Sequence, residues 1–247
     1  MTAIPQPEKE TERDYSLNPA EIIHLITKYQ LLPRLIGELI IDRAILSISI
    51  TKEEINQTYQ QFCRQQRITN DKELQLWLKD RHLILEQLKD LLVRKLKIAK
   101  FKQAQWDSQV DSYFHQHKSQ LDRVVYSLIQ VRDDNLALEL YIRLREKETS
   151  FADIARQYSE GMRAETGGLI GPVDLGTCPA VWAELFAIAQ TGHIYPPQKL
   201  GNSVVIVRLE QYIAAQLNNR MRQRLLNELF AAWLQKEIAV IQHKDFS

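Results

Sequence analysis

The 247-residue sequence has few cysteines and almost no net charge. Its two cysteines, Cys63 and Cys178, lie far apart, and neither belongs to a Cys-x-x-Cys motif. Because a disulfide framework or a thiolate metal site needs more cysteines or closer spacing, we expect two free thiols in a reducing compartment and no bound metal or cofactor. The net charge of +1 argues against a surface dedicated to nucleic acid.

Long uninterrupted apolar runs are also lacking. The most apolar window, residues 31–46, is interrupted by four charged side chains, whereas a membrane span needs roughly 18 or more apolar residues. Residues 1–16 are polar and contain prolines, and they lack the basic flank and apolar run of a secretory signal. We therefore predict a cytoplasmic protein without a membrane span.

Helical patterns fill the sequence up to residue 118. Asn18 and the proline after it form a helix start signal, and we expect that helix to reach about Leu32 before Pro33 interrupts it. The segment Thr51-Lys52-Glu53-Glu54 is a capping box that opens another helix. An apolar stripe ending at Phe101 predicts a longer helix. This part of the chain is predicted to contain almost no strand.

The pattern changes after residue 121. The run VVYSLIQV is rich in β-branched and apolar residues and predicts a short strand. Helices, a second strand, a helix begun by a proline and a final strand should follow, at residues 135–147, 151–158, 169–173, 179–191 and 202–210. After residue 214 an apolar residue recurs at every fourth position, which predicts a long closing helix.

These changes of pattern predict four parts. We expect a disordered tail at 1–17, a helical domain at 18–118, a small α+β domain at 119–213, and a C-terminal helix at 214–247. Since a lone apolar helix does not stay soluble by itself, the C-terminal helix should pack on the N-terminal helical domain.

The order of elements in the third part resembles the parvulin family of peptidyl-prolyl cis/trans isomerases. The matching text is FADIARQYSE, the glycine pair of ETGGLIG, VWAELFAIAQTGHIYPP and LGNSVVIVRLE. The helical flanks resemble those of SurA-like chaperone–isomerases. The resemblance implies an α+β fold, with a parvulin-like small antiparallel sheet and flanking helices inserted into an all-helical SurA-like chaperone domain.

The resemblance also indicates where catalytic groups would lie. The family carries a histidine on the first strand, another on the last strand, and an Asp or Cys in the turn after the second helix. In this sequence Leu128, Ser203 and Gly161 occupy these positions, which implies weak or degenerate catalysis. By alternation along the first strand, Tyr126, Leu128 and Gln130 share one face. The polar side chains that could substitute are Tyr126, Gln130, Glu160 and Ser203.

The proline pocket of the family is better preserved. Cys178 and Trp182 match its methionine and aromatic positions, and Phe186 follows one helical turn later. Together with Leu128 and Met162 they are the candidate substrate-binding residues. The alternative is that Trp182 and Phe186 belong to the ordinary hydrophobic core.

Three functions remain open. The first is a folding factor that binds unfolded or proline-containing polypeptides and isomerises prolyl bonds weakly. The second is a non-catalytic adaptor for one dedicated partner, such as a peptide awaiting maturation or export. The third is an active isomerase that uses the substitute polar groups. None of the three requires nucleic acid.

Overall fold

A computed structural model of the chain describes residues 18–160, 164–188 and 190–245. The chain divides into two compact units. Unit 1 comprises residues 1–105 and 228–247, and unit 2 comprises residues 106–227. We predicted a boundary near residue 118, but the unit that contains the sheet begins at Trp106.

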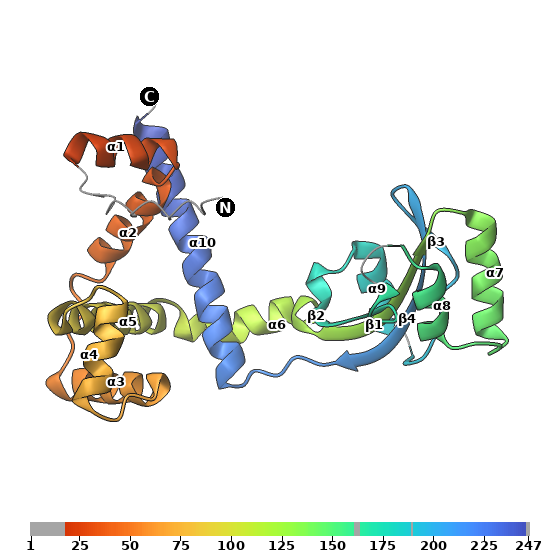
Figure 1. Ribbon diagram of the computed structural model, residues 1–247, viewed down its shortest axis with the longest axis horizontal. Helices are drawn as coiled ribbons and strands as arrows, with labels where there is room; N and C mark the ends of the chain where they lie inside the picture. Colours follow the sequence, from red (N-terminus) through yellow and green to blue (C-terminus); the bar gives the residue numbers. More distant parts are fainter. Residues whose placement is uncertain (1–17, 161–163, 189, 246–247) are drawn as a thin grey trace, which may run out of the picture. The chain divides into compact units, whose positions relative to one another are not determined.

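Unit 1 is helical throughout its described residues (Figure 1). Its helices are α1 (Pro19–Lys28), α2 (Leu32–Ala44), α3 (Lys52–Gln66), α4 (Asp71–Asp80), α5 (Leu85–Trp106) and the later part of α10 (Asn219–Asp245). The absence of strands from residues 18–105 agrees with the sequence prediction.

Local signals set most of these helix ends. At α3 the predicted capping box is present, because Thr51 and Glu54 exchange side-chain and backbone hydrogen bonds. The predicted end of α1 was wrong: the helix stops at Lys28, and Gln30 takes a left-handed conformation with φ 54°. Pro33 does not interrupt α1 but lies in the first turn of α2, where its missing N–H costs no hydrogen bond.

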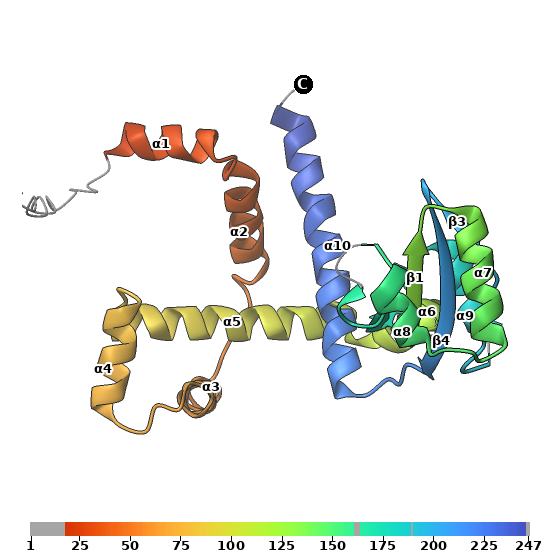
Figure 2. The same cartoon turned by 45° about the vertical axis from the view of Figure 1, so that its right-hand side comes forward.

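Two groups of contacts hold unit 1 together. Helix α4 lies at the start of α5 (Figure 2). Leucines of these two helices form one buried cluster, flanked by an edge-to-face contact between Phe62 and Trp77, whose ring centroids are 4.9 Å apart. The other group involves α10. Phe101 lies 5.3 Å from Trp233 between ring centroids, and a Cβ on Gly37 would lie 3.3 Å from the Ile238 side chain. These contacts pack α10 against α5 and α2.

Unit 2 is built on a four-stranded antiparallel sheet of order β2-β1-β4-β3, which confirms the predicted α+β class. The strands are β1 (Arg123–Val131), β2 (Leu169–Asp174), β3 (Gln198–Leu200) and β4 (Ser203–Ile213). The helices are α6 (Val110–Leu121), α7 (Asp134–Arg145), α8 (Phe151–Tyr158) and α9 (Ala180–Ile188), with short 3₁₀ turns η1 (Asp107–Gln109) and η3 (Leu175–Thr177). The sequence analysis did not predict β3.

Helices cover both faces of this sheet (Figure 1). On one face, here called the aromatic face, α9 packs on a buried cluster that contains Tyr126, Trp182 and Phe186. On the other, the rear face, α7 and α8 pack on Ile129, Ile206 and their neighbours. Because side chains alternate along a strand, consecutive residues of β1 and β4 serve opposite faces.

The glycine pair allows a close approach to the central strand. Gly168 has φ +81°, and a Cβ there would lie 2.6 Å from the carbonyl oxygen of Leu128. The Leu128 N–H donates to the Gly168 carbonyl over 2.9 Å. Only glycine combines this backbone conformation with this proximity.

A buried carboxylate fastens the first end of β1. Asp122 is 4% exposed and accepts hydrogen bonds from the Tyr212 hydroxyl, the Ala215 N–H at 2.7 Å and the Lys118 ammonium at 3.2 Å. Burial alone would raise the pKa of Asp122, but these three donors outweigh it and lower the pKa. Burial and the Asp122 carboxylate together raise the pKa of Tyr212 to about 12.

Replacing Asp122 by alanine should lower the free energy of unfolding of unit 2 by about 3 kcal/mol, because three hydrogen bonds to a buried charge are lost. Since the folded pKa of Asp122 is lowered, its contribution is complete above the unfolded pKa of about 3.9 and disappears as the pH falls through the folded value. Urea unfolding of the full chain between pH 3 and pH 7 measures both effects.

Asp134→Ala is the matched control. Asp134 pairs with Lys199 at 3.3 Å, and both side chains are more than half exposed, so the loss should stay below about 1 kcal/mol. Equal losses in the two variants would contradict a special role for Asp122.

Candidate functional site

The candidate polar and apolar residues of β1 lie on one face, as alternation predicts. Tyr126 and Leu128 belong to the buried cluster of the aromatic face. The Gln130 side-chain amide donates to the Ser203 hydroxyl of β4 over 3.0 Å. Gln130 and Ser203 are both partly buried, so this pair lies at the border between the apolar cluster and solvent.

Leu128 occupies the position matched to the family's first histidine. Its side chain is 0% exposed and lies within the aromatic-face cluster. In this conformation Leu128 offers no surface to a ligand and no hydrogen-bonding group.

Three aromatic rings form the centre of the aromatic face. The Tyr126 ring lies 5.9 Å from Trp182 and 5.4 Å from Phe186 between ring centroids. Trp182 is 5% exposed and Phe186 is 1% exposed. These two residues therefore serve as core in this structure, and a role for either in binding a ligand stays a prediction.

An apolar rim surrounds the aromatic cluster. Five partly buried residues that pack against the cluster form this rim: Ile170, Val173, Cys178, Ala183 and Leu185. The rim, unlike the indole of Trp182, is accessible without any movement of the chain.

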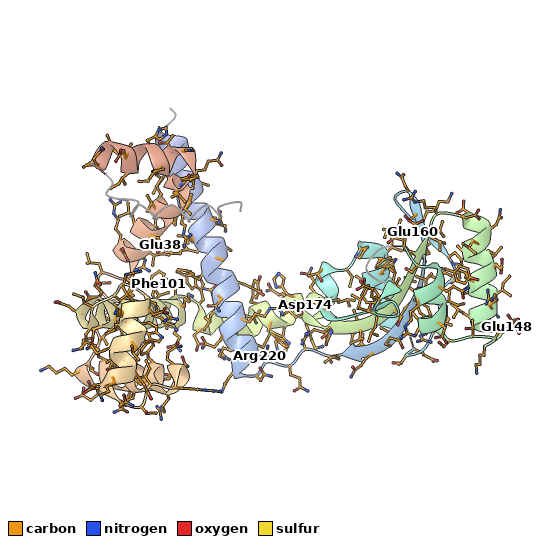
Figure 3. All side chains as sticks on the ribbon, viewed as in Figure 1. Glu38, Phe101, Glu148, Glu160, Asp174 and Arg220 are labelled. Carbon is orange, nitrogen blue, oxygen red and sulfur yellow. The ribbon has the colours of Figure 1, made fainter. Side chains whose placement is uncertain are left out.

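Glu160 lies at the far end of β1 (Figure 3) but does not join the Gln130–Ser203 pair. Its carboxylate accepts from Arg132 over 3.1 Å, while its backbone N–H donates to the Gln130 carbonyl over 2.9 Å. The Ser159 hydroxyl accepts from the Gln130 N–H over 3.1 Å. Two further candidates, Gly161 and Met162, lie outside the described residues.

The structure thus joins two of the four candidate polar side chains directly. Gln130 and Ser203 are hydrogen-bonded, Tyr126 is packed among aromatic rings, and Glu160 pairs with Arg132. The sequence analysis did not include Arg132 among the candidate residues, although its position directly after β1 places it close to the candidate residues at the end of that strand. Neutral amide and hydroxyl groups can donate hydrogen bonds, but they cannot exchange protons near neutral pH as a histidine does.

Two other classes of site are absent from the described part of the chain. Within it, no three His, Cys, Asp or Glu side chains lie close enough together to hold a metal ion. No described helix combines the length and apolarity that crossing a membrane requires.

Cys178 lies on the rim just before α9. Its thiol donates a long hydrogen bond to the Asp174 carbonyl, with 3.9 Å between the heavy atoms. Burial raises the pKa of the Cys178 thiol, so the neutral thiol predominates at neutral pH.

Residues 130–211 match the Rotamase family, described as the PPIC-type PPIASE domain. The match covers about a third of the chain and falls within unit 2. The chain therefore carries a parvulin-type domain, as the sequence predicted. No curated protein matches the chain significantly.

Several solved structures are similar to the chain. PrsA from Bacillus anthracis, a peptidylprolyl isomerase, is 21% identical with a TM-score of 0.48, covering 85% of this chain and 97% of its own. The parvulin domain of PpiD from E. coli is 26% identical with a TM-score of 0.34, and the match covers 40% of this chain and 97% of that domain. A SurA-like chaperone from Campylobacter jejuni is 19% identical with a TM-score of 0.38, covering 94% and 93%.

The raised pKa of Cys178 predicts slow alkylation. With iodoacetamide at pH 7.5, Cys178 should react more slowly than a small-molecule thiol, and its rate should rise as the pH passes the ordinary thiol pKa of about 8.5. Mass spectrometry of peptides resolves Cys178 from Cys63, and the variant Cys178→Ser identifies the remaining signal. Alkylation of Cys178 faster than the free thiol at neutral pH would contradict a neutral, half-buried side chain.

Proposed function

We propose that unit 2 binds proline-containing segments of unfolded polypeptides along the rim of the aromatic face, and that the chain acts as a folding factor with weak prolyl isomerase activity. The observation that carries the proposal is a partly accessible apolar rim on the same face of the sheet as the Gln130–Ser203 pair, in a parvulin-type domain. A proline ring is apolar and its amide carbonyl accepts hydrogen bonds, so a ligand of this class matches both features.

Weak catalysis follows from the side chains present. Rotation about a prolyl bond otherwise takes tens to hundreds of seconds because twisting removes amide resonance. An enzyme accelerates it by binding the twisted amide better than either planar form. Leu128 contributes no polar group, which leaves the hydrogen-bonded amide of Gln130 and hydroxyl of Ser203 as the polar pair on this face of the sheet. An apolar site that desolvates the amide adds a further small acceleration.

Helices of unit 1 support a client-holding role. On α1 and α2, Ile23, Leu32 and Leu39 expose 64%, 56% and 58% of their surfaces. Helix α1 contains no buried residue at all. Exposed apolar side chains of this density are typical of surfaces that hold unfolded polypeptide. A cytoplasmic location for this activity remains part of the proposal.

The alternative is an adaptor that binds one partner without turnover. It is favoured by the same fact that weakens catalysis, namely the complete burial of an apolar side chain at the first histidine position. The two functions share the binding rim, so they differ in turnover and in the range of partners.

Binding at the rim should protect Cys178 from alkylation. A saturating proline-containing peptide with apolar flanking residues should slow iodoacetamide labelling of Cys178 by about fivefold or more, because the bound chain covers a half-buried thiol. Cys63 of α3 is the internal control, and its labelling should not change. If the peptide binds the chain but leaves the iodoacetamide labelling of Cys178 unchanged, the rim is not its binding site.

Isomerisation should be measurable but slow. In a protease-coupled assay on a short prolyl peptide, the full chain should be at least about 100-fold less active than an ordinary parvulin, because single polar groups in active sites typically contribute factors of 10²–10³. Gln130→Ala should reduce the remaining rate, whereas Lys199→Ala, an exposed change on β3, should not.

Activity equal to an ordinary parvulin would refute weak catalysis. Full protection of Cys178 without any measurable isomerisation would identify the adaptor function.

A further inference from the structure

A cavity of about 580 Å³ opens on the rear face of unit 2. It lies where the end of α7 and the loop after it meet the start of α8 and the edge of β4. Figure 3 marks this region by Glu148, at the opposite end of α7 from Glu160. A volume of this size suits a bound ligand of several residues, since ligand pockets typically measure about 300–1,000 Å³.

The floor of the cavity is apolar. Leu144, Phe151 and Ile194 line it, and all three belong to the rear-face core or pack against it. Phe151 is 1% exposed. The floor is therefore a fixed part of the domain core.

The walls of the cavity are positively charged. Arg145, Lys147 and Arg208 line it, and none of its lining residues is an Asp or Glu. Arg208 is held in place: its guanidinium lies 4.8 Å from the Phe151 ring centroid and pairs with Glu210 at 2.8 Å. In the described part of the chain, neither Arg145 nor Lys147 has a carboxylate partner within ion-pair distance.

Of the acidic residues near the cavity in the sequence, Glu146 does not line it, and Glu148 and Asp153 have partners of their own. Glu148 pairs with Arg143, with 3.8 Å between the nearest atoms. Asp153 accepts from the Ser150 hydroxyl and pairs with Arg156 at 3.3 Å. The lining of the cavity therefore carries more positive than negative charge, and its floor is apolar.

We propose that this rear cavity is a second binding site, for an acidic peptide segment of a partner protein that carries apolar side chains beside its carboxylates. Arg145 and Lys147 receive the carboxylates, and the floor formed by Leu144, Phe151 and Ile194 takes the apolar side chains. The hydroxyl group of Thr149, also on the wall, suits the peptide backbone. The combination of cations and apolar floor favours such a peptide over a simple anion.

The rear cavity is independent of the proline rim. On β4, Val207 belongs to the aromatic face, whereas the next residue, Arg208, lines the rear cavity. Ligands on opposite faces of one sheet do not compete for space. One chain can therefore hold a proline-containing segment and an acidic segment at the same time.

The test is fluorescence anisotropy of the full chain with a labelled, proline-free peptide of glutamate and leucine residues. The double variant R145E/K147E should weaken binding by at least about tenfold, because the pair of receiving charges is reversed. The control R220E/K199E makes the same change in net charge outside the cavity and should weaken binding by less than about twofold. The neutral variant R145Q/K147Q should give an intermediate loss.

Three results would overturn the proposal. They are an equal loss of affinity in the two charge-reversal variants, unchanged affinity in R145Q/K147Q, and full displacement of the peptide by 10 mM inorganic phosphate. A peptide with glutamine in place of glutamate should not bind. Since Arg145 and Lys147 are exposed, urea unfolding of their variants should match that of the unaltered chain.

Discussion

The antiparallel pairing of β1 with β4 is the constraint on which both surfaces of unit 2 depend. Leu128 lies opposite Val207, and Ile129 lies opposite Ile206. A slip of one residue in either strand would exchange its two faces. The side chains of the aromatic cluster would then point toward α7 and α8, and Arg208 would point away from the rear cavity. One ladder of hydrogen bonds therefore determines where both the rim and the cavity lie.

Polar contacts fasten this ladder at its two ends. At the first end Asp122, directly before β1, is joined to Tyr212 near the end of β4 and to Ala215 just after it. At the other end Gln130 joins β1 to the start of β4 through Ser203. The second contact has a structural use of its own, so the polar groups that remain at the candidate site also hold the sheet. This polar pair therefore has a structural role that does not depend on catalysis.

Local patterns in the sequence predicted much of the fold, and long-range packing explains the rest. Caps such as Thr51 act within one turn, and alternation in β1 acts within one strand, so a single sequence reveals both. The edge strand β3 has three residues and little pattern, and it forms only because β4 is beside it. The burial of Trp182 and the rear cavity depend on helices that meet from distant parts of the chain, which no local window contains.

The buried side chain of Leu128 sets the apolar character of the centre of the aromatic face. A buried histidine would have to be hydrogen-bonded or pay a desolvation cost. Leucine instead fills the same space between Tyr126 and the β4 valines with apolar atoms, and it strengthens the core. Unit 2 therefore combines a tightly packed core with an apolar rim on one face and a cationic cavity on the other.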